Sequence, residues 1–143
     1  MPTRYATANW SGGLKNGKGS LSLQSGVFKG PYDYKSRFEE GPSTNPEELL
    51  GAAHAGCFAM FFSSLLEKNE TPATNVEVKA DVTLTPGADG PTITKIVLHL
   101  VGDVPKITKD KFSELAKEAK NNCPISKSLA SVPSVELEIT LKS

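Results

Sequence analysis

The first third of the chain alternates polar and apolar side chains between glycine-rich turns. Residues 19–26 have a clear period of two, and residues 32–38 alternate in the same way. A period of two places successive side chains on opposite faces of an extended strand. We therefore predict three short strands joined by turns, in an antiparallel meander.

A long and largely apolar stretch follows, from Leu49 to Lys68. Just before it, Asn45 suits the cap of a helix and Pro46 suits the first turn, and two acidic residues come next, near the positive end of the helix dipole. The stretch is apolar nearly all the way round a helix, so we predict a helix that is central and buried. One chain of this size has difficulty surrounding such a helix, which favours a dimer in which two of them pack at the centre.

The remainder of the chain predicts a hairpin, a helix, a short helical turn and a closing strand. Residues 76–84 alternate strictly, and residues 93–101 form a β-rich partner across a turn rich in proline and glycine. Residues 109–122 carry apolar side chains at helical spacing, residues 123–126 open a helical turn, and residues 135–141 make the last strand. This order of elements indicates an α+β fold with antiparallel sheets rather than a parallel α/β fold.

Size and charge narrow the class of protein. The chain has 143 residues without a repeat or a linker, so we expect a single domain over residues 1–143. Lysine plus arginine total 16, as do aspartate plus glutamate, and this balance gives no reason to expect a nucleic acid or a membrane surface as partner. The N-terminal residues contain no apolar block like that of a signal peptide. We therefore expect a soluble protein of the cytoplasm.

The two cysteines, Cys57 and Cys123, are the strongest candidates for chemistry. Their number alone leaves three roles open: a small apolar core residue, a structural disulfide, or a catalytic thiol. Cys57 lies within the long helix among small residues, where Phe58, Phe61 and Phe62 could wall an apolar pocket. Cys123 follows a helix and precedes a proline. One thiol in a rigid helix and one at a mobile junction suit peroxide reduction, in which one thiolate attacks and a second thiol resolves the sulfenic acid.

A thiolate at neutral pH requires a nearby positive group, because the pKa of a free thiol is about 8.5. Arg37, which we expect at the end of a strand before the long helix, is one candidate, and the lysines are others. Glu47 or Glu48 could hold the guanidinium in place. Both acids also suit the first turn of a helix, which is their minimum role.

The chain resembles a known family in two segments. Residues 45–58, Asn-Pro-Glu-Glu-Leu-Leu-Gly-Ala-Ala-His-Ala-Gly-Cys-Phe, and residues 122–126, Asn-Cys-Pro-Ile-Ser, look like the OsmC/Ohr family of osmotically inducible and organic hydroperoxide resistance proteins. The order and length of the segments agree over essentially the whole chain. Arg37-Phe38 and His54 make the resemblance closer to the OsmC branch.

The resemblance implies a function, a site and partners. Cys57 would be the peroxidatic thiolate and Cys123 the resolving thiol, with Arg37 and Glu47 as the polar pair that activates Cys57 and orients the peroxide. The family forms intertwined homodimers with active sites at the subunit interface, and it needs no metal, flavin or other cofactor. The substrate would be an organic hydroperoxide, and the reductant an external dithiol such as a lipoyl protein.

The spacing of the site residues raises a geometric question. Glu47 lies ten residues before Cys57, which corresponds to about 15 Å along an unbroken helix. A glutamate side chain cannot span that distance. Either the helix is interrupted near Gly51, or Glu47 acts on the Cys57 of a second subunit, and we favour the second hypothesis.

Three other functions remain open at this stage. His54 is one helical turn before Cys57, so a Cys–His nucleophile for acyl transfer is conceivable, although a packed or interface histidine is the simpler interpretation. Zinc could be held by both cysteines, His54 and His99, but no close pair of ligands is present and His99 lies in an amphipathic segment. The third alternative is a protein that binds an apolar small molecule without redox chemistry.

Overall fold

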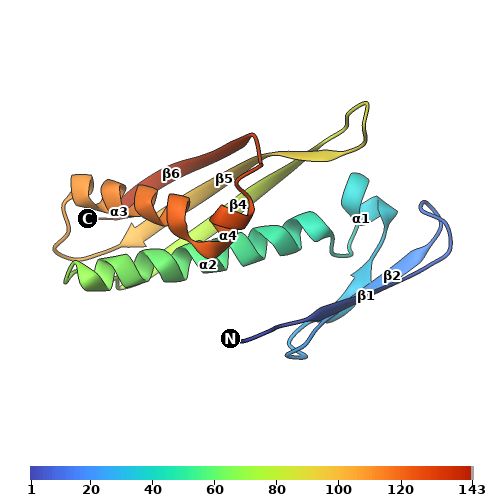
Figure 1. Ribbon diagram of the computed structural model, residues 1–143, viewed down its shortest axis with the longest axis horizontal. Coiled ribbons are helices and arrows are strands. Elements are labelled where there is room, and N and C mark those ends of the chain that lie inside the picture. The colour runs from blue at the N-terminus through green and yellow to red at the C-terminus, as the bar shows by residue number, and fades with distance from the viewer. Residues whose placement is uncertain (143) are drawn as a thin grey trace. The chain divides into compact units, whose positions relative to one another are not determined.

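The structure of the protein is a computed structural model that describes residues 1–142 (Figure 1). Along the chain, the elements are β1 (Ala6–Ser11), β2 (Lys18–Leu23), β3 (Lys29–Tyr32), α1 (Tyr34–Phe38), α2 (Pro46–Lys68), β4 (Asn75–Thr85), β5 (Thr92–Asp103), α3 (Lys109–Asn122), α4 (Pro124–Ser128) and β6 (Ser134–Lys142). They fall into two compact units, Met1–Leu49 and Leu50–Ser143, which we call the N-terminal and C-terminal units. That residues 1–143 form a single domain stays a prediction.

The N-terminal unit contains the predicted antiparallel meander, in the order β1-β2-β3. The prediction of a strand over residues 32–38 was wrong, because the last strand ends at Tyr32 and residues 34–38 form the short helix α1. Asp33 caps this helix: its carboxylate accepts a hydrogen bond from the backbone N–H of Ser36 at 2.8 Å. Such a cap satisfies one of the free N–H groups of a first helical turn. Arg37 is consequently on a helix and not at the end of a strand.

The sheet of the N-terminal unit buries little. The rings of Trp10 and Tyr32 pack with their centroids 5.3 Å apart, and the absence of a side chain at Gly19 makes room for both. Among the described residues of this unit, the buried side chains are those of Ser36 and Glu47, which are both polar. This unit therefore has no buried apolar side chain within residues 1–49.

The C-terminal unit contains a sheet in the order β4-β5-β6. The pair β4–β5 is the predicted antiparallel hairpin. The pair β5–β6 is parallel, so this sheet is mixed and not antiparallel throughout. Parallel neighbours need a long crossover connection, and the segment containing α3 and α4 provides one. The α+β class and the long helix are as predicted.

The hydrophobic core of the C-terminal unit lies between the sheet and the helices α2 and α3, and Figure 1 shows α2 running lengthwise along the strands. Phe62 of α2 is at its centre, with its ring centroid 6.0 Å from that of Phe58 and 5.2 Å from that of Phe112 on α3. Alternate residues of β5 face the same core. The buried apolar residues are Phe58, Phe62, Leu65, Leu66, Ile96, Leu98, Leu100, Val104, Phe112, Leu115, Ala116, Ala119 and Cys123.

The helix α2 is buried on one face within this chain, as expected of a helix that one chain of this size has difficulty surrounding; burial of its other face in a dimer stays a prediction. Met60 is 78% exposed, and a side chain added at Gly56 would meet no atom within 4 Å. By length and composition α2 could cross a membrane, a test that the core helix of a soluble protein also passes. One of its faces carries the phenylalanines of the core.

Candidate thiol site and its comparison with known proteins

The structure brings the two cysteines together within the C-terminal unit. Cys57 lies on α2 and is half-buried, whereas Cys123 is fully buried where α3 ends and α4 begins. Both are free thiols. A hydrogen bond between their side chains is among the causes that shift the pKa of Cys57. The junction predicted for Cys123 is therefore present, although its side chain is enclosed.

The surroundings of Cys57 disfavour a thiolate. Burial raises the pKa of the Cys57 thiol, the backbone N–H of Ile125 lowers it, and the hydrogen bond to Cys123 raises it again, with a net increase. Burial has this effect because a charged sulfur loses solvation in an apolar environment. None of these described neighbours is a cation. Stabilising the thiolate form of Cys57 consequently requires a positive group that is not among these neighbours.

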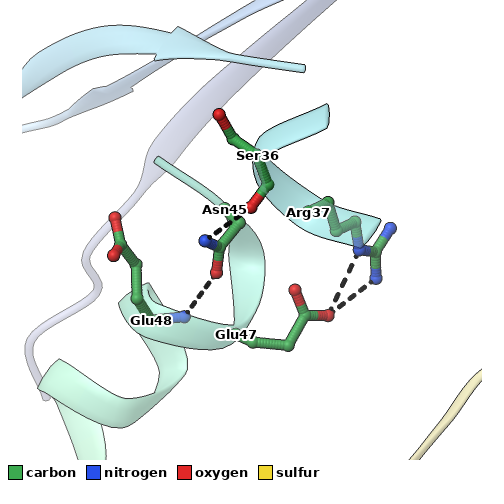
Figure 2. A network of polar contacts seen from close by, with 5 residues as sticks. All are labelled: Ser36, Arg37, Asn45, Glu47 and Glu48. Carbon is green, nitrogen blue, oxygen red and sulfur yellow. Dashed lines mark hydrogen bonds and ion pairs between the residues drawn. The ribbon is translucent and has the colours of Figure 1, made fainter. Parts of the chain in front are cut away.

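The predicted polar pair, Arg37 and Glu47, is formed within the N-terminal unit (Figure 2). The Nε and Nη2 atoms of Arg37 donate to Oε1 of Glu47 at 3.2 and 3.0 Å. Glu47 is 8% exposed, while the side chain of Arg37 is 37% exposed. The guanidinium is thus held from one side by a buried carboxylate, and part of it remains accessible to a ligand.

The start of α2 holds this pair in place. Asn45 caps the helix, because its Oδ1 accepts from the backbone N–H of Glu48 at 2.8 Å, as the sequence predicts. Its Nδ2 donates to the backbone oxygen of Ser36 at 3.1 Å and so ties α1 to the first turn of α2, as Figure 2 shows. The second carboxylate oxygen of Glu47, Oε2, is buried and has no hydrogen-bond partner among the described residues. An unsatisfied buried acceptor of this kind is uncommon in folded proteins.

An apolar pocket of about 200 Å³ lies beside Arg37 in the N-terminal unit. Aromatic side chains dominate its wall, which consists of Trp10, Leu14, Tyr32, Asp33, Tyr34, Arg37 and Phe38. The prediction that Phe58, Phe61 and Phe62 wall an open pocket was wrong for two of the three. Phe58 and Phe62 are fully buried in the core and only Phe61 is partly exposed. The aromatic pocket is therefore associated with the arginine rather than with the helix of Cys57.

His54 is fully buried and is bonded to a residue that the sequence analysis did not single out. Its Nε2 lies 2.7 Å from Oγ of Ser126, and the thiol of Cys123 donates to the same hydroxyl at 3.0 Å. The recorded partner of His54 is thus a serine and not Cys57, which gives no support to a Cys–His nucleophile. Ser126 lies 72 residues after His54, so the sequence does not show that the two are bonded. The one signal for Ser126 is its position three residues after Cys123, where its backbone N–H reaches the sulfur.

The four-ligand zinc set is not assembled among the described residues, where no group of three or more possible ligands is found. His99 instead lies between two carboxylates. Its Nε2 is 2.7 Å from Asp81 and its Nδ1 is 2.9 Å from Glu138. Because the neighbouring residues of β5 are buried in the core, His99 faces the opposite side of the sheet, as the amphipathic pattern predicts.

Two neighbouring free thiols in an α+β fold are the arrangement that thiol redox chemistry requires. The chain belongs to the OsmC family: a family model described as OsmC-like protein matches residues 39–138. The family to which the sequence was assigned is therefore confirmed.

Individual relatives agree with this assignment. The chain is 42% identical over 137 residues, 95% of its length and 94% of the relative's, to peroxiredoxin OsmC of Escherichia coli. It is 27% identical to an organic hydroperoxide resistance protein-like protein of Staphylococcus aureus, over 71% of the chain and 73% of the relative. The crystal structure of the organic hydroperoxide resistance protein OhrB of Bacillus subtilis has the same fold, with a TM-score of 0.67 at 23% identity over 96% of this chain and 98% of that one. The predicted enzyme class, a peroxidase, is confirmed, and the function is a peroxide-related redox function.

Proposed function

We propose that this protein reduces organic hydroperoxides to alcohols, and hydrogen peroxide more weakly, through a sulfenic acid on Cys57 and a disulfide between Cys57 and Cys123. The observation that carries the proposal is the contact between these two thiols, one on α2 and one at the α3–α4 junction. The names of the relatives, a peroxiredoxin and an organic hydroperoxide resistance protein-like protein, support it.

The cycle has three steps. The thiolate of Cys57 attacks the terminal oxygen of ROOH, the O–O bond breaks, and the alcohol leaves after taking up a proton. The thiol of Cys123 then displaces hydroxide from the sulfenic acid, which yields the disulfide and water. An external dithiol, a small molecule or a lipoyl protein, reduces the disulfide by thiol–disulfide exchange. We place this cycle in the cytoplasm, where thiols are kept reduced.

We propose Arg37 and Glu47 as the groups that activate Cys57. A guanidinium beside the sulfur opposes the effect of burial, because an opposite charge favours the thiolate. The helix α2 is continuous from Pro46 to Lys68. It has no interruption near Gly51 that would bring Glu47 closer to the Cys57 of its own helix. The pair would therefore serve the Cys57 of a second subunit in a homodimer. The exposed face of α2 and the absence of a buried apolar side chain in residues 1–49 support such a dimer.

The pocket beside Arg37 is the feature that favours organic substrates. A guanidinium at its edge would bind the peroxide oxygens, and its aromatic wall would cover the organic group. Burial of apolar surface contributes about 25 cal/mol per Å², a contribution that hydrogen peroxide cannot make. Comparable kcat/KM values for hydrogen peroxide and cumene hydroperoxide would contradict this preference.

Consumption of cumene hydroperoxide with dithiothreitol tests the reaction. We expect turnover in the native protein and none in Cys57→Ser, because the remaining thiol, that of Cys123, is fully buried. Cys123→Ser should give one equivalent of sulfenic acid and no disulfide. Activity that survives Cys57→Ser would refute the proposal and would favour a non-redox binding protein, whose ligand the aromatic pocket could hold.

Mixed dimers test the position of Glu47. Subunits with Glu47→Ala and subunits with Cys57→Ser are each expected to be inactive alone. If Glu47 acts across the dimer, a heterodimer of the two contains one intact site and one doubly damaged site, so mixing restores activity. If Glu47 acts within its own subunit, no site is intact and mixing restores nothing.

A further inference from the structure

A chain of hydrogen bonds links the buried thiol of Cys123 to a buried imidazole. The thiol donates to Oγ of Ser126 at 3.0 Å, and this hydroxyl lies 2.7 Å from Nε2 of His54. The three side chains come from different places: the α3–α4 junction, α4 and α2. The distance between Ser126 and His54 is typical of a good hydrogen bond between a hydroxyl and a ring nitrogen.

The direction of this series of hydrogen bonds follows from the number of protons that each side chain can donate. A serine hydroxyl has one proton and accepts with its lone pairs. Because the hydroxyl of Ser126 accepts from Cys123, its own proton is available for Nε2 of His54. The neutral imidazole therefore has its lone pair on Nε2 and its proton on Nδ1. The chain runs from thiol to hydroxyl to imidazole, which is the order needed to take a proton away from sulfur.

The environment of His54 keeps it in the form that accepts a proton. Burial lowers the pKa of His54, so the imidazole is neutral at neutral pH. Its titratable neighbours are Cys57 one turn along α2 and Cys123 through the serine, and no described charged group contributes to the shift. Nδ1 is buried without a partner among the described residues. An unsatisfied buried nitrogen is costly.

We propose that His54 is a positioning residue for the resolving step and, through Ser126, takes the proton of Cys123 as its sulfur attacks the sulfenic acid of Cys57. This inference rests on the proposed function, which supplies the sulfenic acid. The S–H bond of Cys123 and the S–OH bond of Cys57 break, and an S–S bond forms. The sulfur of Cys123 is oxidised and that of Cys57 is reduced. His54 returns the proton through Ser126 to the leaving hydroxide, which departs as water, so no proton is gained or lost.

A single-turnover experiment separates this step from the first. Reduced protein is mixed with one equivalent of cumene hydroperoxide and no dithiol, and samples are quenched over time with a dimedone-type reagent that traps sulfenic acid. Intact mass then gives the fractions of sulfenic adduct and disulfide. In Ser126→Ala we expect sulfenic acid to accumulate, because the rate of disulfide formation falls by roughly 100-fold, the usual contribution of proton transfer.

Two further variants distinguish proton transfer from packing. Ser126→Thr retains the hydroxyl and should restore the rate. His54→Gln retains a hydrogen-bond acceptor but cannot hold a proton, so it should be as slow as Ser126→Ala. The native rate of disulfide formation should decrease as the pH falls through the lowered pKa of His54, and His54→Gln should lose this dependence. A matched control is Ser128→Ala, two residues later on α4, whose hydroxyl bonds only to Pro124 O in the described structure and which should keep the native rate.

An unchanged rate of disulfide formation in Ser126→Ala would overturn the relay, since solvent would then suffice as proton acceptor. A native rate in His54→Gln would overturn the role of the imidazole in the same way. If Cys123→Ser forms no sulfenic adduct at all, the proposed function fails, and the relay fails with it.

Discussion

The two units of the chain differ in what they bury. The C-terminal unit encloses a contiguous set of apolar side chains, with Phe62 at its centre. In the described part of the N-terminal unit the buried side chains are Ser36 and Glu47. A three-stranded sheet normally needs a packed apolar face to be stable. The comparison indicates that the C-terminal unit has an apolar core of its own, whereas residues 1–49 do not form one.

The same division separates the proposed chemistry. The C-terminal unit holds both sulfurs, in surroundings that raise the pKa of Cys57. The N-terminal unit holds the cation, Arg37, and the carboxylate that fixes it. A thiol benefits from a rigid apolar core, because its geometry is then defined, but the same core disfavours its charged form. If Arg37 activates the Cys57 of a second subunit, as proposed, the pKa of the thiol depends on assembly.

The largest expected difference between the units concerns the core. Phe62→Ala removes a fully buried ring that contacts two other phenylalanines, so we expect the free energy of unfolding to fall by about 3–5 kcal/mol. The matched change in the N-terminal unit, Phe38→Ala, affects a ring that is 36% exposed. Its cost should be clearly smaller. Urea denaturation followed by circular dichroism measures both, and equal losses would contradict the comparison.

Two glycines, one in each unit, allow a second comparison of packing, with a smaller expected loss of stability. A methyl group at Gly102 would lie 2.5 Å from Cε2 of Phe112, and one at Gly19 would lie 2.4 Å from Cε1 of Tyr32. Phe112 is fully buried and cannot move aside, so Gly102→Ala should cost about 1–3 kcal/mol through overpacking. The methyl at Gly19 would also meet the ring of Trp10, but Tyr32 and Trp10 are both only half-buried and can rotate outward, so Gly19→Ala should cost less. Thermal unfolding of the two variants gives the order, and a larger loss for Gly19→Ala would show that the N-terminal sheet is packed more tightly than described.

The smallest effect is a local response to acid in the N-terminal unit. The hydrogen bond from the backbone of Ser36 holds the pKa of Asp33 below its usual value. Because the pKa of Asp33 is lowered in the folded state, its carboxylate stabilises α1 at pH values above the unfolded pKa of about 3.9. This contribution is lost as the pH falls through the lower folded pKa.

Nuclear magnetic resonance of the Ser36 amide checks this response. Its shift should titrate with a midpoint below about 3.9 in the native protein. Asp33→Asn keeps a capping oxygen but removes the ionisable group, so the same amide should show no titration in that variant. A midpoint at or above the ordinary value would mean that the cap does not form in solution.

The elements that the sequence predicted well are those whose signals are local. The helix at 109–122 alternates charged and apolar residues at helical spacing, and its predicted bounds are those observed. The start of α2 was readable from Asn45 and Pro46. The helix α1 was missed because the alternation of aromatic and polar residues over residues 32–38 imitates a strand, and only the Asp33 cap indicates a helix. The parallel pairing of β6 was missed because strand partners are chosen by tertiary packing and not by local composition.

The candidate site was predictable to a similar extent. The residues Cys57, Cys123, Arg37 and Glu47 were named from the sequence, and the structure pairs the first two and the last two. Their catalytic roles remain predictions. The link from His54 to Ser126 could not be read, because 72 residues separate the two and a histidine in an apolar helix usually packs in a core. The position of the aromatic pocket depends on how the first strands fold, which composition does not indicate.

The long separation of the two thiols along the chain affects the stability of the fold as well as the reactivity of the site. Cys123 comes 66 positions after Cys57, and a disulfide that closes a loop of this length restricts the unfolded chain by about 4 kcal/mol in the chain-entropy description. Each catalytic disulfide would therefore also stabilise the folded state until it is reduced. Molecules that have reacted and await reductant should resist heat and proteolysis better than molecules ready to react. The protein would be most durable when oxidant is abundant and reductant is scarce.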